Sequence, residues 1–211
     1  MRRAIRFGWV EVNFGVGVGV TRSTDHLIGK SILGYRFDFQ PVTGRYAGEV
    51  MLTVRAARAD DRDAIWAILE PVIRAGDTYT LPRRMSRDEG LAYWNASGHE
   101  VFVAEEDGHV IGTYFLRANQ AGGGSHVANC GYITAADRRG KGIARAMCGH
   151  SLERAKGRGF RAMQFNFVVS SNERAVRLWK SLGFEIVGRL PEAFLDPSGD
   201  YRDAYVMYRL L

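Results

Sequence analysis

The stretch Arg138-Arg139-Gly140-Lys141-Gly142-Ile143-Ala144 decides the fold class, because it joins an expected strand, 127–134, to an expected amphipathic helix, 143–156. Its two glycines let the backbone turn sharply and approach a ligand closely. The start of the following helix offers N–H groups without intrahelical partners and the positive end of the helix dipole. We therefore expect this segment to hold a diphosphate, with Arg138, Arg139 and Lys141 adding positive charge.

A second motif follows about thirty residues later, where Asn172 opens the run NERAVRLWKSLGF, which ends at Phe184. The glycine spacing of the first motif is neither G-x-G-x-x-G nor G-x-x-x-x-G-K-[ST], so neither dinucleotide nor P-loop binding is indicated. Its pattern, R-x-x-G-x-A, resembles the acetyl-CoA signature of the GCN5-related N-acetyltransferases (GNAT). The Asn-led helix ending in Leu-Gly-Phe resembles the second hallmark of that family. The resemblance covers roughly Leu52 to Leu211.

The resemblance implies an α/β fold with a mixed, mostly antiparallel sheet, splayed central strands and helices on both faces. It implies acetyl-CoA as cosubstrate, with its acetyl-pantetheine arm in the gap between the splayed strands. The positions that match the cofactor motifs of the family are Ile133, Thr134, Arg138, Arg139, Gly140, Lys141, Gly142, Ile143, Ala144 and Asn172.

Hydrophobic periodicity and turn signals predict the element order βααβββαβαββ over residues 51–211. The expected strands are 53–57, 101–105, 110–116, 127–134, 162–169, 185–189 and 204–210, and the expected helices are 62–73, 86–94, 143–156 and 172–182. Ser86 and Glu89 form a capping box, and Asp107-Gly108 is typical of a tight hairpin turn. In the strand 162–169, alternation places Met163, Phe165, Phe167 and Val169 on one face.

Three amides stand out in the two strands around the expected split. By alternation, Asn129 shares a face with Val127, Gly131 and Ile133, while Gln164 and Asn166 lie opposite the Phe-rich face. We interpret Gln164 as satisfied by its neighbours, and Asn129 and Asn166 as lining a site.

A narrower resemblance points the same way. The pattern is similar to the fungal N-acetyltransferases that detoxify azetidine-2-carboxylate, which implies that Asn129 and Asn166 bind the substrate amino acid. The layout also resembles phosphinothricin-type acetyltransferases, including the loop 76–80.

The proton donor and the base are not fixed by the sequence. Many family members carry, at the position of Trp179, a Tyr that protonates the departing thiolate. Here the proton could come from water, from Tyr132 or from the ammonium of the substrate. The sequence does not identify a catalytic residue, and the candidates are Asn129 and Tyr132. The candidates for the general base are Glu70, Glu105, Glu106 and His126, and an ordered water is an alternative proton relay.

Bulk properties limit the alternatives. The 211 residues carry 29 Lys and Arg against 23 Asp and Glu, a net charge of +6, but the basic residues are scattered, so nucleic-acid binding is not expected. Cys130 and Cys148 lack metal-site spacing and are expected to be buried thiols in the cytoplasm. No apolar run has the length of a membrane span.

The sequence therefore predicts direct transfer of acetyl to the amine of a small molecule. The alternatives are acetylation of a protein N-terminus or lysine, and an acyl-CoA-binding module with little catalysis. No metal is expected, and a homodimer is expected from the family.

Residues 1–50 differ from the domain 51–211. Gly15, Gly17 and Gly19 alternate with valines, and no helical period appears. One hypothesis is that Met51 is the native start and 1–50 a mis-called or disordered extension. The alternative is a hairpin that uses the strand-like segments 10–12 and 34–39.

Overall fold

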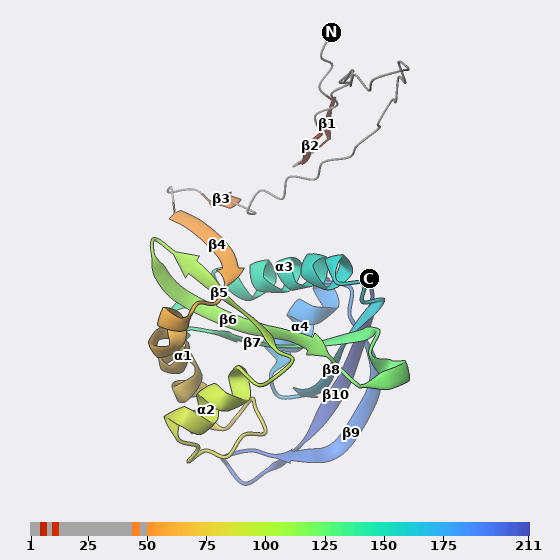
Figure 1. Ribbon diagram of the computed structural model, residues 1–211. Helices are drawn as coiled ribbons and strands as arrows, with labels where there is room; N and C mark the ends of the chain where they lie inside the picture. Colours follow the sequence, from red (N-terminus) through yellow and green to blue (C-terminus); the bar gives the residue numbers. More distant parts are fainter. Residues whose placement is uncertain (1–4, 8–9, 13–43, 47–49) are drawn as a thin grey trace, which may run out of the picture. The chain divides into compact units, whose positions relative to one another are not determined.

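The computed structural model describes residues 5–7, 10–12, 44–46 and 50–211 (Figure 1). Within 50–211 the elements follow the predicted order βααβββαβαββ, with short 3-10 turns between some of them. They are β4 (Val50–Ala56), α1 (Arg62–Ala75), α2 (Arg87–Trp94), β5 (Glu100–Glu106), β6 (His109–Ala118), β7 (Val127–Thr134), α3 (Ile143–Gly157), β8 (Ala162–Val169), α4 (Glu173–Ser181), β9 (Glu185–Leu195) and β10 (Tyr201–Leu210).

The chain divides into two compact units, 1–40 and 41–211. In the first unit, β1 (Ile5–Phe7) pairs antiparallel with β2 (Val10–Val12). The expected strand 34–39 lies outside the described residues. The hypothesis that Met51 is the native start therefore stays a prediction.

In the second unit the described strands form one sheet in the order β3-β4-β5-β6-β7-β8-β10-β9, with β3 (Gly44–Tyr46) at its edge. Every neighbouring pair is antiparallel except β7 and β8, which run parallel. That parallel pair is joined only at Val127–Ala162 and Ala128–Met163. Beyond these two pairs the strands part, so the predicted mixed sheet with splayed central strands is confirmed.

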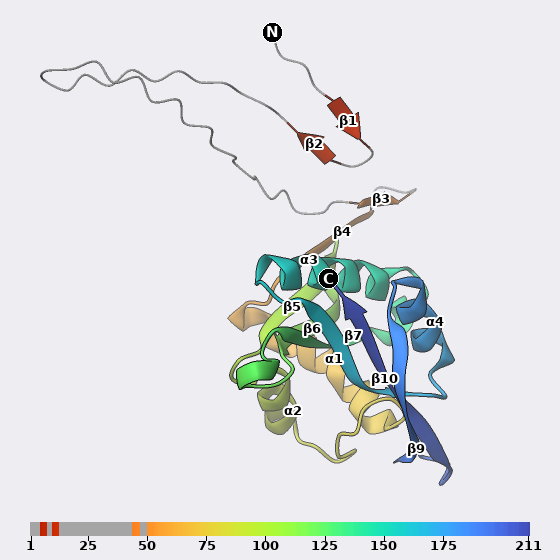
Figure 2. The same ribbon diagram turned by 90° about the vertical axis from the view of Figure 1, so that its right-hand side faces the viewer.

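The helices cover both faces of the sheet, with α3 on one side and α1 and α2 on the other (Figures 1 and 2). On the first side, Met147 of α3 and Trp179 of α4 pack in one cluster with Phe165 of β8. On the second, Leu69 of α1 and Trp94 of α2 pack with Phe115 and Ile133. Alternation along β7 is therefore as expected, because Cys130 belongs to the first cluster and Ile133 to the second.

Alternation along β8 fails at a β-bulge. Val168 pairs with Tyr205 of β10, and Phe165 pairs with Met207. Three residue steps along β8 therefore lie opposite two steps along β10, so β8 contains one extra residue. The extra residue reverses the parity of the strand, so Val168 joins Phe165 in the cluster beneath α3 and α4. The prediction that Phe165 and Phe167 share a face is wrong, because a sequence pattern carries no signal for the bulge.

Some element boundaries also differ from the prediction. The helix α1 runs through Pro71 to Ala75 and ends at Gly76, whose φ is +66°. The closing hairpin is longer than expected, since β9 reaches Leu195 and β10 starts at Tyr201. The Asp107-Gly108 turn has positive φ at both residues, as such hairpin turns require. Among the described helices, none combines the length and apolar character needed to cross a membrane.

An ion cluster at the start of α1 joins it to the sheet. The carboxylate of Asp61, only 6% exposed, accepts hydrogen bonds from Arg55 Nη1 at 2.7 Å and Nη2 at 2.9 Å, and from the Arg58 N–H at 2.6 Å. Arg55 of β4 also donates through Nε to Glu105 of β5 at 2.7 Å. The hydrogen bonds from Arg55, and next from the Arg58 backbone, lower the pKa of Asp61.

We expect Asp61→Asn to lower the free energy of unfolding by about 1–3 kcal/mol, because it leaves a hydrogen-bonded guanidinium short of a charged partner. Since the folded state depresses the pKa of Asp61, this stabilisation is present above the unfolded pKa, about 3.9, and is lost as the pH falls through the folded value. Urea unfolding from pH 2.5 to 7 measures it. The exposed neighbour variant Asp60→Asn is the control and should stay within about 0.5 kcal/mol. A difference between Asp61→Asn and the parent that is the same at every pH would contradict the prediction.

Candidate functional site

A first cavity of about 530 Å³ opens beside the end of β7, the start of α3 and the start of α4. Nine of the ten residues expected at the cofactor line it, and Lys141 is the exception. The nine are Ile133, Thr134, Arg138, Arg139, Gly140, Gly142, Ile143, Ala144 and Asn172. The two motifs recognised in the sequence, separated by about thirty residues, therefore meet at one cavity.

The loop before α3 depends on its two glycines. Gly140 has φ +89° and Gly142 has φ +81°, both in the left-handed region that favours glycine. A Cβ at Gly140 would lie 2.7 Å from Nη2 of Arg174. Gly142 is the N-cap of α3, and no side chain caps that helix. The N–H groups of the first turn are thus left for an anion.

The cations at this cavity are not all the expected ones. Arg138 is held by Glu106 at 2.5 Å, which offsets its charge. Two arginines that the sequence analysis missed, Arg145 and Arg174, also line the cavity. Both lie in the first turn of a helix, where the dipole disfavours a cation in the absence of a bound anion. That unfavourable position is the signal that could have identified them.

A second cavity, of about 280 Å³, lies at the split between β7 and β8. Asn129 and Asn166 both line it, as does Phe167, which the bulge in β8 brings to the same side as Asn166. The two cavities have six lining residues in common: Thr78, Tyr79, Tyr132, Asn172, Ala175 and Trp179. They therefore adjoin along a shared wall.

The amides at the split are hydrogen-bonded, and one of these bonds crosses it. Asn129 Nδ2 donates to the Gln164 carbonyl at 2.9 Å, just past the last backbone pair of β7 and β8. Asn166 Nδ2 donates to Asn119 Oδ1 at 2.7 Å, and its own Oδ1 accepts from Gln164 Nε2 at 2.8 Å. The Gln164 side chain is thus satisfied by a neighbour, in line with its structural interpretation.

The loop 76–80 closes against β7 through Tyr79. The hydroxyl of Tyr79 donates to the Tyr132 carbonyl at 3.1 Å, and burial raises the pKa of that hydroxyl. A Cβ at Gly131 would lie 2.6 Å from Phe115 Cε1 and 3.2 Å from Tyr79 Oη. Only a glycine on β7 leaves room for both rings, a role the sequence analysis did not assign to Gly131 or Tyr79.

The shared wall is aromatic. The rings of Tyr132 and Trp179 lie 5.2 Å apart between centroids. The Tyr132 hydroxyl makes a 2.6 Å hydrogen bond with Ser151 Oγ, which in turn donates to the Cys148 carbonyl at 2.8 Å. Burial raises the pKa of Tyr132 well above its ordinary value. The ring of Tyr132 therefore faces the cavities, while its hydroxyl is engaged in the core.

Asn172 caps α4 and lies on the same wall. Its Oδ1 accepts from the Ala175 N–H at 3.2 Å and so satisfies an N–H group in the first turn of the helix. Because Asn172 also lines both cavities, its amide nitrogen is placed where a ligand could bind it.

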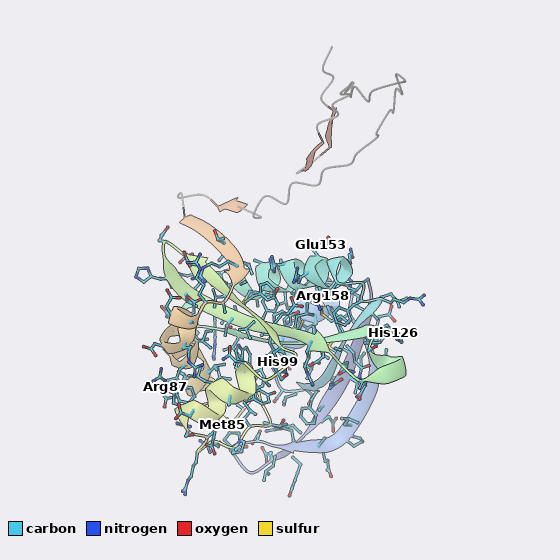
Figure 3. The ribbon with its side chains drawn as sticks, in the orientation of Figure 1. Met85, Arg87, His99, His126, Glu153 and Arg158 are labelled. Atoms are coloured by element: carbon cyan, nitrogen blue, oxygen red, sulfur yellow. The ribbon has the colours of Figure 1, made fainter. Side chains whose placement is uncertain are left out.

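None of the four bases considered from the sequence lines either cavity. Glu70 pairs with Arg74, Glu105 with Arg55 and Glu106 with Arg138. His126 is exposed and lies at the periphery of the domain, just before β7 (Figure 3). Both cysteines are buried, and burial raises the pKa of Cys130 and raises that of Cys148 to about 11.

Comparison with known proteins agrees with this geometry. A model of the acetyltransferase (GNAT) family matches residues 64–184. The chain is similar to N-acetyltransferase aca1 of Schizosaccharomyces pombe, with 27% identity over 151 residues, 64% of this chain and 72% of that protein.

Two solved structures extend the comparison. A GCN5-related N-acetyltransferase from Kribbella flavida aligns with a TM-score of 0.72 and 38% identity, over 76% of this chain and 98% of that chain. A phosphinothricin acetyltransferase from Sinorhizobium meliloti, solved with acetyl-CoA, aligns with a TM-score of 0.68 and 24% identity, over 76% and 88% of the two chains. At that identity the second likeness concerns the fold alone.

Proposed function

The chain belongs to the acetyltransferase (GNAT) family, and from that premise we propose that it transfers acetyl directly from acetyl-CoA to the amine of a small amino acid or analogue. That it is an N-acetyltransferase with acetyl-CoA as cosubstrate follows from the family. The finer proposal rests on one observation, the two cavities that share a wall at the split of the sheet.

In this proposal acetyl-CoA occupies the first cavity. The residues present suit a diphosphate, because two glycines with positive φ precede a helix that no side chain caps. Arg139, Arg145 and Arg174, which line the cavity, add positive charge for the phosphates. Ile133 and Thr134 line the same cavity at the end of β7, beside the expected path of the pantetheine arm.

The acceptor occupies the second cavity, with Asn129 and Asn166 as hydrogen-bonding partners. Its volume of about 280 Å³ lies below the range of roughly 300–1,000 Å³ typical of drug-sized ligands. A small molecule suits such a site better than a protein segment does. The adjoining wall brings the amine to the thioester, which is the orientation that direct transfer needs.

Direct transfer is favoured over an acetylated enzyme because neither cysteine suits a nucleophile. The thiol is reactive only as thiolate, and burial raises the pKa of both Cys130 and Cys148. In the reaction a C–N bond forms, the acetyl C–S bond breaks, and one proton passes from the amine to solvent or to the thiolate. No carboxylate lines the acceptor cavity among the described residues, so we assign the proton relay to water.

The departing thiolate is proposed to leave without a side-chain acid. Trp179 occupies the position of the usual Tyr and has no proton of comparable acidity. The Tyr132 hydroxyl is engaged by Ser151, and Tyr132 then acts through its ring as part of the wall. Of the three proton sources considered from the sequence, water and the substrate ammonium remain.

The function is tested by measuring CoA release from acetyl-CoA with a panel of amines. The panel contains L-azetidine-2-carboxylate, L-proline, phosphinothricin, methionine sulfoximine, polyamines and a peptide mixture. We expect turnover on a small amino acid or analogue that falls at least about tenfold in Asn129→Ala and in Asn166→Ala, since each removes a polar contact to the acceptor.

Acetyl-CoA binding by the two variants, measured by calorimetry, is the control for folding and should be unchanged. Turnover on the peptide mixture alone would identify a protein acetyltransferase. Tight binding of acetyl-CoA without turnover of any amine would identify a binding module. Either result overturns the proposal.

Gly142→Ala and Gly159→Ala form a matched pair for the cofactor site. The two glycines flank α3, have φ of +81° and +80°, and have no atom within 4 Å of a built Cβ. Each alanine should cost about 1–2 kcal/mol of stability through the left-handed backbone. We expect only Gly142→Ala to weaken acetyl-CoA binding, by about tenfold or more, because only Gly142 lines the cavity. Calorimetric Kd values decide this, and equal weakening in both variants would contradict it.

Tyr132→Phe tests the absence of a tyrosine acid. We expect kcat within about threefold of the parent and a stability loss of about 1 kcal/mol, from the lost hydrogen bond to Ser151. Tyr114→Phe is the control, because its hydroxyl also makes a core hydrogen bond, with His150 at 2.6 Å, while the residue lines neither cavity. If kcat fell a hundredfold in Tyr132→Phe with acetyl-CoA binding intact, Tyr132 would be the acid.

A further inference from the structure

The acceptor cavity carries a single charge. Of the described residues that line it, Arg117 alone has a side chain charged at neutral pH, and the others are aromatic, aliphatic, amide, hydroxyl, thiol or glycine. Arg117 is in β6, directly opposite Asn129 of β7, and is partly buried. The acceptor amine therefore enters a site with one fixed positive charge and no negative one.

The guanidinium of Arg117 is also without an ion pair among the residues described. Its Nε donates to Asn129 Oδ1 at 3.3 Å, and its two terminal nitrogens make no hydrogen bond to a described protein group. Two other arginines of the sheet, Arg55 of β4 and Arg189 of β9, each pair with a carboxylate. A partly buried cation without a counter-ion is unfavourable unless a ligand supplies one.

The imidazole of His99, close to this cavity, adds no positive charge to it. His99 stacks on Phe115 with ring centroids 4.3 Å apart, and Phe115 lines the acceptor cavity. Burial, and to a lesser extent the charge of Arg117, lower the pKa of His99, while a hydrogen bond with the Trp94 carbonyl raises it. The lowered pKa favours the neutral form of His99, so Arg117 is the one charged side chain among the described residues lining this cavity.

We propose that Arg117 binds the carboxylate of the acceptor through its two free terminal nitrogens and so selects amino acids over simple amines, an inference that rests on the proposed function. The planar fork of a guanidinium matches a carboxylate with two parallel hydrogen bonds. In this arrangement Asn129, beside its proposed contact with the acceptor, also positions Arg117, because its Oδ1 accepts from Nε and so orients the terminal nitrogens.

The placement suits a compact acceptor. Arg117 pairs with Asn129, three residues along β7 from Tyr132, whose ring lines both cavities. Three residues of a strand span about 10 Å, which an α-amino acid and the length of an arginine side chain together can bridge. A protein N-terminus or a lysine side chain lacks an α-carboxylate at this distance, and a polyamine would be repelled by Arg117.

The test compares acceptors that differ only at the carboxylate. CoA release is measured for L-azetidine-2-carboxylate, L-proline and L-methionine, each beside its carboxamide, in the parent and in Arg117→Met. We expect kcat/KM for at least one free acid to fall by about 10- to 100-fold in Arg117→Met, chiefly through KM. For the corresponding carboxamide, kcat/KM should change by less than about threefold. Arg117→Lys, which keeps the charge but loses the fork, should retain part of the preference.

Arg84→Met is the charge-matched control, since it removes one exposed arginine that lines neither cavity. It should leave kcat/KM unchanged for the free acids and for their carboxamides. Unchanged acetyl-CoA binding in Arg117→Met excludes misfolding. An equal loss for acid and carboxamide, or no loss for any of the three acids, would overturn the proposal.

A binding measurement separates failure of this inference from failure of the proposed function. The N-acetyl derivatives of the three amino acids and of their carboxamides are titrated into the parent and Arg117→Met with CoA present. We expect the Kd of at least one free acid to be tenfold or more weaker in Arg117→Met, whether or not any amine is turned over. If the parent binds no acid more tightly than its carboxamide, Arg117 does not select the carboxylate.

Discussion

The interruption of backbone pairing between β7 and β8 is the constraint on which the rest of this structure depends. Two parallel strands in the middle of a sheet pair at Val127 and Ala128 and then part, although each continues to the end of its element. Backbone N–H and C=O groups in a sheet interior need partners. Asn129 supplies one for the Gln164 carbonyl, and Tyr79 supplies one for the Tyr132 carbonyl. The split is therefore stabilised by side chains and remains open to ligands.

The split also explains why both cavities lie where they do. Because the strands diverge, the end of β7 points at the start of α3, and the start of α4 approaches from β8. The first cavity forms between them, while the second forms on the other side of the same gap. Tyr132 and Trp179 line both cavities, so in the proposed reaction the acetyl group passes from one cavity to the other beside these two rings. The relative placement of the two cavities thus follows from the topology of the sheet.

The fold and the anion loop could be predicted from sequence because their signals are local. Gly140 and Gly142 predict the turn with left-handed backbone, and the order of strand, loop and helix predicts the topology. The amides at the split could be predicted because a polar side chain in an apolar strand is conspicuous. The bulge in β8 could not, since one extra residue leaves no trace in the alternation that it breaks.

Other parts of the site could not be predicted because they depend on contacts between residues far apart in the sequence. The sequence predicts Arg138 at the cofactor but carries no signal for its ion pair with Glu106, thirty-two residues away. Arg145 and Arg174 were not predicted because the cavity that they share lies between α3 and α4, two helices whose proximity the sequence does not show.

Arg117 was missed for a related reason, since a charged residue at the end of a strand usually faces solvent. Only the structure places it opposite Asn129, in a cavity without a carboxylate among its described residues. Leaving this guanidinium uncompensated costs folding free energy that an apolar side chain would not cost, and an anionic acceptor would offset that cost on binding. A site with such a charge gains affinity and selectivity at the expense of the stability of the free protein. Since the first cavity is also rich in arginine, each half of the site is completed by an anion under this proposal, the diphosphate in the first cavity and the acceptor carboxylate in the second.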